Sequence, residues 1–472
     1  MAGLRPSTAV SATCADGCAR AIARACVLGT SLSLAVAGCC AAYVTPESIT
    51  LWQDPSPPAL SLAEKAGRYQ TELERLHLTK EGILRYRIDL KRPEDPSYGN
   101  LADGSFHTGI YLSSQALRFA VTREPAAREQ VLKVLDGLRI LMEVTGKHGL
   151  LARHITPAGT LPLSPAVEGE EGKWRPSATH PELFWRGDVS KDQYAGFIHG
   201  LGVTLAVVKD PEVRARVADL AGAAADHLIE NHLQIIDTDG SRTTFGDLQG
   251  HAAFVPLGIN ALIALAIAKV AAESTGEERH AAFYRNLLDR GYVRAAYWAR
   301  IPFVKSLNRV NDNMAYLALY PLLLLEKDAG TLNALREAEG RSFGSLRDER
   351  NAFFALTHAV AWAGDPRAAA EGRAEGREAL LEFPDDKIAR PVDLTRPGFD
   401  FPIALKRSKK CEPRSKRAVP LYLRPRGSCF WVSDPYRLVG NLTHLGDTVT
   451  SGQDYLLVYW IARHHGIVAE GE

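Results

Sequence analysis

The sequence predicts an all-α protein built as an (α/α)6 toroid, a closed ring of six helical hairpins, and three observations predict it. Apolar residues recur at helical spacing along nearly the whole chain after residue 58. Charged helical segments alternate with segments that are apolar nearly all round. Of the 472 residues 46% are hydrophobic, and 56 Lys and Arg balance 55 Asp and Glu, so the chain can bury a large core. The balanced charge gives no reason to expect nucleic acid as a partner.

The opening residues have the composition of an export signal. Arginines precede an apolar run over 25–38, which is too short to span a bilayer as a stable helix. The run ends in Val-Ala-Gly-Cys, which resembles the bacterial lipobox, a signal whose cysteine is acylated and becomes the mature N-terminus. We therefore expect a signal peptide at 1–38, a lipid anchor on Cys39, and a tether rich in Pro, Ser and Thr over 39–58. A plain cleaved signal peptide is the alternative.

The rest of the chain, residues 59–472, is expected to form the toroid. The periodicity predicts helices at 59–76, 105–121, 124–144, 190–208, 211–231, 249–273, 277–298, 311–326, 330–340, 349–363, 366–381 and 452–465. These twelve segments make six consecutive hairpins. Strand candidates at 83–88, 149–153 and 233–236 are short, and we expect them to form small β-hairpins that decorate the loops.

Two kinds of helix alternate. The segments that are charged on one face, as outer helices should be, are 124–144, 211–231, 277–298 and 366–381. The segments that are apolar nearly all round, as buried inner helices should be, are 194–208, 252–270 and 314–325. Since no exact repeat is visible, a tetratricopeptide-like solenoid is not expected, and a generic helical solenoid remains the structural alternative.

Polar residues gather in the loops that lead into the predicted inner helices. Because the inner helices of a toroid run parallel, these loops should meet at one rim. The loops are 103–108, 185–194, 245–251, 308–313, 347–351 and 444–455. Helix capping explains some of their Asp, Ser and Asn residues. It does not explain a second polar residue one turn further in, as in the pairs Asp103 with His107, Asp188 with Asp192 and Asp247 with His251.

Paired carboxylates suit the chemistry of glycosides. One carboxyl protonates the leaving oxygen while the other activates water or attacks directly, and their environments separate their pKa values. Asp188 and Asp192 are therefore the leading acid and base candidates, followed by His107, His251 and Asp312. A uronate lyase or epimerase would instead need a His, Tyr or Lys near the proton to be abstracted.

Other rim residues are expected to bind substrate. They are Asp103, Trp185, Arg186, Gln193, Tyr194, Asp247, Asn311, Asp312, Asn313, Arg350, Asp454 and Tyr455. Trp185, Tyr194 and Tyr455, together with Phe106, could stack on sugar rings, although ordinary packing would explain each of them equally well. His199 and His358 lie deeper in their helices and are expected to belong to the core or to support the site from behind.

The alternating helices and the chemistry of the loops resemble the six-hairpin glycosidase superfamily, over about residues 59–470. That superfamily includes unsaturated glucuronyl hydrolases, other glycoside hydrolases, certain polysaccharide lyases and uronate epimerases. Unsaturated glucuronyl hydrolases have an Asp three residues before a Trp that is followed shortly by Arg-Gly. Here Glu182 keeps the spacing to Trp185, but it replaces the Asp, and one residue fewer precedes Arg-Gly. The resemblance implies the toroid and a carbohydrate substrate without assigning that reaction, and Glu182 stays a candidate acid.

No metal or cofactor is expected. The segment 237–241 begins like a calcium loop but lacks the later ligands, so we interpret it as a polar hairpin turn. His464 and His465 are too closely spaced to be two ligands on one helix face. The chain contains no phosphate loop, no dinucleotide fingerprint and no nucleophile elbow.

The helical pattern stops over about 383–450, where a long, basic, Pro-punctuated insertion precedes the last inner helix. This insertion is either a solvated loop or a flap over the rim, and as a flap its charge would favour an anionic ligand. It contains Cys411 and Cys429, which an exported protein could pair or leave as free thiols.

The sequence therefore predicts a carbohydrate-active envelope lipoprotein, with a glycoside hydrolase as the favoured activity and an oligo- or polysaccharide, neutral or anionic, as its partner. It would be exported and held at a bacterial membrane, facing the periplasm or the cell surface. The alternative is a non-catalytic lipoprotein that binds a glycan or a protein, and within enzymes a lyase or an epimerase. Two carboxyl groups about 5 to 9.5 Å apart across an open funnel would favour hydrolysis.

Overall fold

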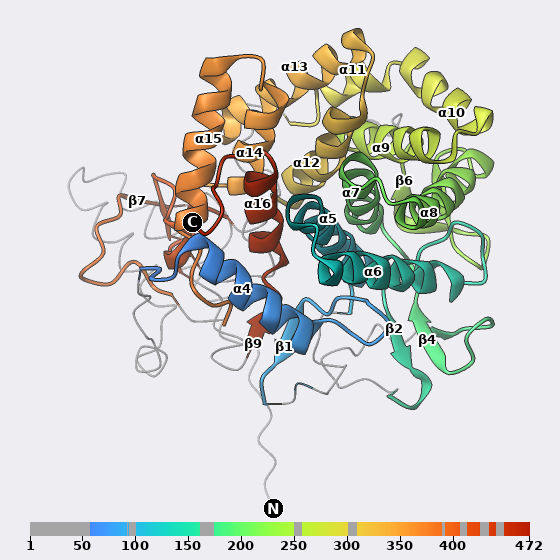
Figure 1. The fold of residues 1–472 in the computed structure, drawn as a ribbon, viewed down its shortest axis with the longest axis horizontal. Helices are drawn as coiled ribbons and strands as arrows, with labels where there is room; N and C mark the ends of the chain where they lie inside the picture. Colours follow the sequence, from blue (N-terminus) through green and yellow to red (C-terminus); the bar gives the residue numbers. More distant parts are fainter. Residues whose placement is uncertain are drawn as a thin grey trace, which may run out of the picture.

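The computed structural model describes residues 57–91, 93, 101–160, 174–249, 257–300, 309–388, 392–405, 413–424, 434–439 and 448–472. The expected signal peptide, the lipid anchor on Cys39 and nearly all of the tether lie outside these residues, as do His251, Cys411 and Cys429. Much of the basic insertion also lies outside them. Within the described residues the chain is mostly helical (Figure 1).

The long helices alternate between an outer and an inner layer. The inner helices are α5 (Gly104–Thr122), α7 (Lys191–Val207), α9 (Leu257–Thr275), α12 (Arg309–Leu325), α14 (Ala352–Ala361) and α16 (Gln453–His464). The outer helices are α4 (Leu62–Glu72), α6 (Pro125–Glu143), α8 (Pro211–Glu230), α10 (Glu278–Asp289) with the short α11 (Tyr292–Ala296), α13 (Ala329–Leu346) and α15 (Pro366–Leu381). Figure 1 shows the outer helices surrounding the inner ones. The predicted helices are confirmed in number and order, apart from a break in the predicted segment 277–298 at Gly291, which has a φ of 80°.

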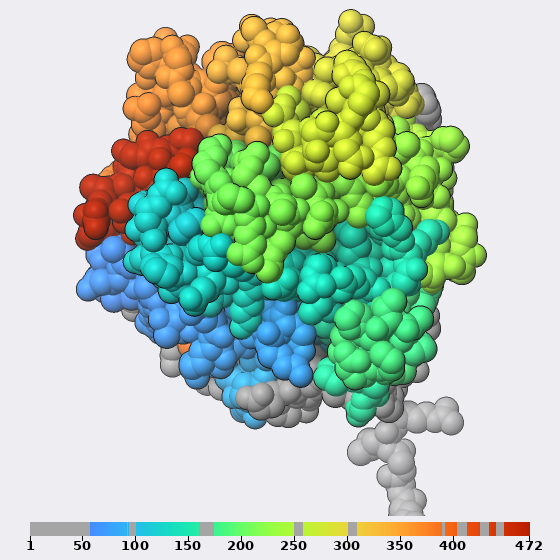
Figure 2. Space-filling view, turned by 45° about the vertical axis from the view of Figure 1, so that its right-hand side comes forward, coloured from blue at the N-terminus to red at the C-terminus, as the bar shows by residue number. Residues whose placement is uncertain are grey.

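The ring closes between the two ends of the chain. The last helix, α16, packs against α5 and α4, and each inner helix packs against its neighbours in the ring. Figure 2 shows this closure on the surface, where the red C-terminal segment lies beside the blue N-terminal one. The described chain is thus an (α/α)6 toroid rather than an open solenoid.

Local sequence signals start several outer helices. Ser61 forms a capping box with Glu64 at the start of α4. Asp210, Asp328 and Asp365 accept backbone hydrogen bonds at the starts of α8, α13 and α15. The inner helices α5 and α7 differ, because their N-cap residues, Asp103 and Ser190, form no side-chain cap hydrogen bond. At these two positions capping does not use the polar side chain.

The inner helices pack at unusually short range because glycines line their contacts. A Cβ atom on Gly196 of α7 would lie 2.4 Å from the carbonyl oxygen of Phe106 on α5, and one on Gly109 would lie 2.0 Å from the carbonyl oxygen of Gly196. Only glycine permits this approach of two backbones. The contact fixes the first turns of α5 and α7 side by side.

Small antiparallel sheets lie between the helices. The pairs are β1 (Arg87–Asp89) with β9 (Thr448–Thr450), β5 (Gln234–Ile236) with β6 (Arg242–Asp247), and β7 (Ile403–Leu405) with β8 (Pro413–Ser415). A three-stranded sheet has the order β2 (Ile155–Pro157), β4 (Leu183–Arg186), β3 (Trp174–Pro176). The turn between β5 and β6 is the polar hairpin turn expected at 237–241.

The prediction of a strand at 149–153 is wrong. Gly149 has a φ of 68°, and its backbone lies against Ala223 of α8. This conformation keeps the segment irregular. Sequence patterning also did not find β3 and β4.

One described helix, within α9, is long and apolar enough to cross a membrane by length and composition alone. The window Gly258–Thr275 is 78% buried inside the protein. It is an inner helix of the toroid, and its apolar surface packs against α7, α8, α10 and α12. Its composition is therefore explained by the core.

Candidate active site

The first turns of the inner helices lie at one rim, and side-chain contacts link them in order. Gln453 Nε2 lies 2.6 Å from His107 Nδ1, which joins α16 to α5. Gln193 Nε2 donates to Asp103 Oδ1 at 2.9 Å and Ser105 donates to Gln193 Oε1 at 2.7 Å, which joins α5 to α7. Such contacts are possible only if these helices begin at the same end of the ring.

The other half of the rim is joined in the same way. The end of β6 bridges α7 and α9, because Thr244 binds Asp188 and Asn260 donates to the carbonyl oxygen of Asp247 at 3.0 Å. Arg300, which precedes α12, forms an ion pair with Asp312 in its first turn. Arg309 pairs with Glu349, just before α14, at 2.7 Å, and α14 packs against α16.

Asp192 is a carboxyl group at this rim whose environment differs from that of an exposed acid. It lies in the first turn of α7, where burial raises its pKa and the nearby charge of Asp103 raises it further. The positive charges of Arg153 and Lys191 lower the pKa of Asp192, but the net shift is still upward. No other described residue forms a hydrogen bond or an ion pair with the Asp192 carboxylate, which leaves it able to act on a ligand.

Asp103 is the second carboxyl group of this cluster, and its environment differs. Its side chain is 37% exposed, accepts a hydrogen bond from Gln193, and lies 3.8 Å from Arg153 Nη1. Arg153 also donates to the carbonyl oxygens of Ala102 and Asp188, at 3.1 and 2.7 Å. Arg153 therefore clamps the loops before α5 and α7 together. We call Asp103, Arg153, Lys191, Asp192 and Gln193 the acid site.

Sequence reasoning missed Arg153, because it placed this residue in a short strand. Nothing in the local pattern marks its role, which depends on carbonyl groups 35 and 51 residues away. Cations gather near the acid site. Burial, and then the charge of Arg153, lowers the pKa of Arg186 to about 10, and burial lowers the pKa of Lys191.

The expected pairing of Asp188 with Asp192 on one helical face is wrong. Helix α7 begins only at Lys191, and Asp188 precedes it with a φ of 51°. Its carboxylate accepts hydrogen bonds from the backbone and the hydroxyl of Thr244, at 2.8 and 3.2 Å. Its own N–H donates to Asp237 at 3.0 Å. Asp188 therefore positions the β5–β6 hairpin beside the acid site.

His107 is in the first turn of α5, as expected, but it is buried. Its ring lies against that of Tyr86, with 4.2 Å between ring centroids and a tilt of 37°, and Nδ1 contacts Gln453. Burial, and then the charge of Arg87, lowers the pKa of His107 to about 3, so the imidazole is neutral at physiological pH. Its contact with Gln453 links α5 to α16.

The aromatic residues that could stack on sugar are buried, so the alternative of ordinary packing explains them. Trp185, Tyr194, Tyr455 and Phe106 all belong to the core. Tyr194 donates to the carbonyl oxygen of Gly149 at 3.0 Å, and Tyr455 donates to that of Leu62 at 2.8 Å. A ring face that packs against protein cannot receive a sugar.

Three polar residues expected at the site serve other purposes. Asp454 is fully buried in an ion pair with Lys387 at 2.7 Å. Arg350 turns outward to Glu378 and Glu382 on and just after α15. Glu182 lies before β4 with its side chain 69% exposed, and its ion-pair partner is His180. These placements correct the corresponding expectations, because each of the three charges already has an ion-pair partner.

The remaining candidates lie on inner helices or the hairpin beside them. Asp247 ends β6 and pairs with Arg242 at 2.7 Å, and Asn311 is half-buried at the start of α12. Asp312 is buried between Arg300 and Arg309.

Deeper in the described part of the toroid, Asn313 and His199 have buried polar atoms without hydrogen-bond partners: the Asn313 amide and His199 Nε2. Buried polar atoms of this kind need an explanation, and a polar ligand is one.

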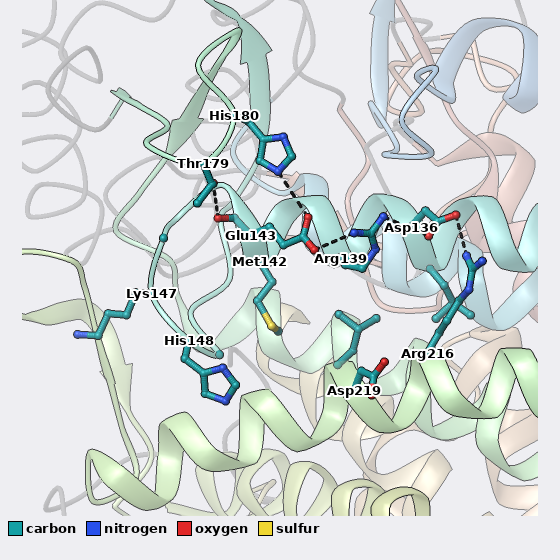
Figure 3. A pocket seen from close by; sticks show the side chains of 14 residues that line it. Asp136, Arg139, Met142, Glu143, Lys147, His148, Thr179, His180, Arg216 and Asp219 are labelled. Atoms are coloured by element: carbon teal, nitrogen blue, oxygen red, sulfur yellow. Dashed lines mark hydrogen bonds and ion pairs between the residues drawn. The ribbon is translucent and has the colours of Figure 1, made fainter.

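The cavity of about 620 Å³ drawn in Figure 3 lies elsewhere, on the outside of the ring between α6 and α8. Its floor is apolar, and several of its charged side chains pair with one another: Arg139 with Glu143, Arg216 with Asp136, and His180 with Glu143. We therefore take the acid site as the candidate site. Among the described residues, no group of three or more His, Cys, Asp and Glu could hold a metal ion.

Comparisons with known proteins found similarity only among solved structures. No protein-family model matches the sequence, and no curated protein matches it. The chain is similar to the structure of the GH76A alpha-1,6-mannanase from Salegentibacter sp. HEL1_6, with a TM-score of 0.44 and 9% identity over 86% of this chain and 100% of that one. It is also similar to the cellulase Cel9M of C. cellulolyticum, with a TM-score of 0.39 and 8% identity over 85% of this chain and 99% of that one.

Proposed function

We propose that this protein is a glycoside hydrolase-like enzyme whose acid site lies where α5 and α7 begin. One observation carries the proposal: two carboxyl groups of one cluster have unequal environments. Burial and the charge of Asp103 raise the pKa of Asp192, which favours the protonated acid. Asp103 is more exposed and interacts with two donors, Gln193 and Arg153. An acid and a base separated in this way are what glycoside hydrolysis requires.

The roles follow from these environments. Protonated Asp192 donates its proton to the glycosidic oxygen while the bond from that oxygen to the anomeric carbon breaks. The carboxylate of Asp103 either accepts a proton from the water that attacks the anomeric carbon or attacks that carbon itself. Gln193 and Arg153 hold Asp103 in place, and Asp188 holds the neighbouring hairpin.

The substrate that fits this rim is an oligo- or polysaccharide. Arg153 and Lys191 belong to the acid site and Arg186 lies near it, and their positive charge favours a sugar chain that carries carboxylates. The same cations would stabilise anionic intermediates in a uronate lyase or epimerase. His107 is not a good base for that chemistry, because it is buried and contacts Gln453.

A non-catalytic glycan-binding protein is the second candidate. The observation that favours it is the position of Asp188. Its carboxylate accepts hydrogen bonds from Thr244, so one acidic side chain fewer is available for catalysis. Binding and turnover must therefore be measured separately.

The experiment compares the purified protein with Asp192→Asn and Asp103→Asn on neutral and uronic oligosaccharides. We expect each variant to lower kcat by about 100-fold or more, since a positioned acid or base contributes 10²–10⁴-fold. Glu129→Gln is the control, because Glu129 is exposed on the outer helix α6. Glycan binding without turnover would favour the second candidate, and neither binding nor turnover on any substrate would overturn both.

We also propose that the protein is exported and anchored to a bacterial membrane through an acylated Cys39. The support is the order of basic residues, apolar run and Val-Ala-Gly-Cys at the start of the chain. Membrane fractionation of Cys39→Ala, with Cys40→Ala as the matched control, tests this. Loss of membrane attachment in the first variant alone is the expected result.

A further inference from the structure

We infer that Phe245 and Trp298 form a track of sugar-stacking platforms that leads along the rim from the acid site, so that the substrate is a chain of several sugars. This inference rests on the proposed function and names the class of substrate that the site takes. In the described part of the chain, these are the two aromatic side chains that are largely exposed, at 61% and 54%. Both rings lie on elements near the rim, so each could offer an apolar face to a ligand there.

Phe245 is turned outward by an irregularity in the β5–β6 hairpin. The register of the pairing shifts between Gln234 and Ile236, so the successive residues Thr244 and Phe245 both face out of the sheet. A shift of this kind re-aims a side chain. Thr244 donates to Asp188, which precedes α7, so Phe245 follows directly on the contact that ties this hairpin to the loop before α7.

The hairpin that carries Phe245 is fixed rather than free. Gly246 lets the strand press against Ile235, since a Cβ atom at this position would lie 2.9 Å from Ile235 Cβ. Asn260 of α9 donates to the carbonyl oxygen of Asp247 at 3.0 Å, which ties the end of the strand to the next inner helix. A platform on an anchored strand loses little entropy when a ligand binds.

Trp298 lies further along the same rim, where α9 and α12 begin. Its neighbour Ala299 packs on Gly258 in the first turn of α9, and Arg300 pairs with Asp312 in the first turn of α12. The guanidinium of Arg341 lies over the indole ring, 4.2 Å from its centroid. This contact holds the ring, and the ring is still more than half exposed.

A sugar chain fits this arrangement better than a protein or a membrane. A protein or membrane partner needs a contiguous apolar area of several hundred Å², whereas these rings stand on separate elements among polar groups. Exposed Thr244 and half-buried Asp247 lie beside Phe245, and Arg341 lies beside Trp298. A pyranose ring presents an apolar C–H face to an aromatic ring and hydroxyl groups to such polar neighbours.

The test measures kcat/KM and binding for oligosaccharides of increasing length, from two sugars to the parent polysaccharide. Trp298→Ala and Phe245→Ala should each lower kcat/KM on long chains by about five- to tenfold, as expected for the loss of one aromatic stacking contact. The shortest substrate should be unaffected. Trp298→Phe should retain most of the activity, because it keeps a ring. Leu381→Ala, which removes an exposed apolar side chain at the end of the outer helix α15, is the control and should change nothing.

Equal losses at every chain length, or no loss at any length, would overturn the inference while the hydrolase proposal stands. Affinity electrophoresis measures binding to the polysaccharide independently of turnover. It therefore shows whether the platforms bind sugar even if the protein does not hydrolyse it. If the parent protein binds polysaccharide without turnover and Trp298→Ala weakens that binding, the platforms are confirmed and hydrolysis is wrong. If the parent protein binds no glycan, the inference is wrong.

Discussion

Asp188 and Asp192 are four residues apart in the sequence but have opposite environments. The carboxylate of Asp188 binds the backbone and hydroxyl of Thr244, whereas that of Asp192 has no partner among the described residues and has a raised pKa. The boundary of one helix explains the difference, because α7 begins at Lys191. At the scale of the residue, an acidic side chain is available for chemistry only when the fold has not already used its oxygens.

The raised pKa of Asp192 makes a prediction about stability. A carboxyl group whose pKa is higher in the folded protein than in the unfolded chain contributes stability at low pH, and this contribution is lost as pH rises through the raised pKa. Asp192→Asn has no such group. We therefore expect the free energy of unfolding of this variant to increase relative to that of the parent as pH rises from about 4 to 8, as measured by urea unfolding at several pH values.

The control for this series is Glu129→Gln, whose exposed side chain should give a difference that does not change with pH. Parallel curves for the parent protein and Asp192→Asn would show that the environment of Asp192 does not differ between the folded and unfolded states.

At the scale of the element, the pair α5 and α7 positions the acid site. Asp103 and Asp192 come from loops and first turns that are brought together only because glycines let the two helices approach closely. Hydrogen bonds from Gln193 then fix the relative position of the two first turns. The geometry of the site is therefore a consequence of backbone packing one turn further along each helix.

Gly196→Ala tests this dependence. The added Cβ atom would lie 2.4 Å from the carbonyl oxygen of Phe106, and a backbone atom cannot move aside as a flexible side chain would. We expect a loss of about 1 to 3 kcal/mol in the free energy of unfolding, together with lower turnover. Gly67→Ala is the matched control in the outer helix α4, where nothing lies within 4 Å, and it should raise stability by up to about 1 kcal/mol. Similar effects of the two substitutions would contradict the packing argument.

At the scale of the whole molecule, the ring must be closed for the rim to exist. The chain after α15 returns to the start of α16 through Lys387, whose ammonium group binds Asp454 at 2.7 Å with both side chains almost fully buried. Lys65 on α4 donates to the carbonyl oxygen of Phe383 in the same region. These contacts hold the first and last helices of the chain together.

Breaking the buried pair should destabilise the closed ring. Lys387→Met or Asp454→Asn each leaves one buried partner without the opposite charge, which costs about 3 to 5 kcal/mol. The double variant Lys387→Met with Asp454→Asn should lose less than the sum of the two single losses, because no buried charge remains unpaired. Thermal unfolding of all four proteins measures this. Additive losses would show that the two residues do not interact.

The sequence by itself determined the class and order of the fold. The alternation of charged and apolar segments at helical spacing is a local property, so the helices, their pairing and their inner or outer position could all be predicted from it. The convergence of the loops at one rim followed from parallel inner helices. The resemblance to six-hairpin glycosidases followed from the same pattern.

Only the tertiary structure decided which rim residues are free to act. Asp454 and Tyr455 lie in a polar loop before an inner helix, which is where the sequence predicts substrate-binding residues. In the structure both are buried, and they contact Lys387 and Leu62, which are distant in the sequence. Arg153 gains its role from carbonyl groups far away in the sequence, and Phe245 owes its exposure to a shift in strand pairing. Burial and hydrogen-bond partners are properties of the assembled chain, because each depends on which distant backbone atoms lie within about 3 Å.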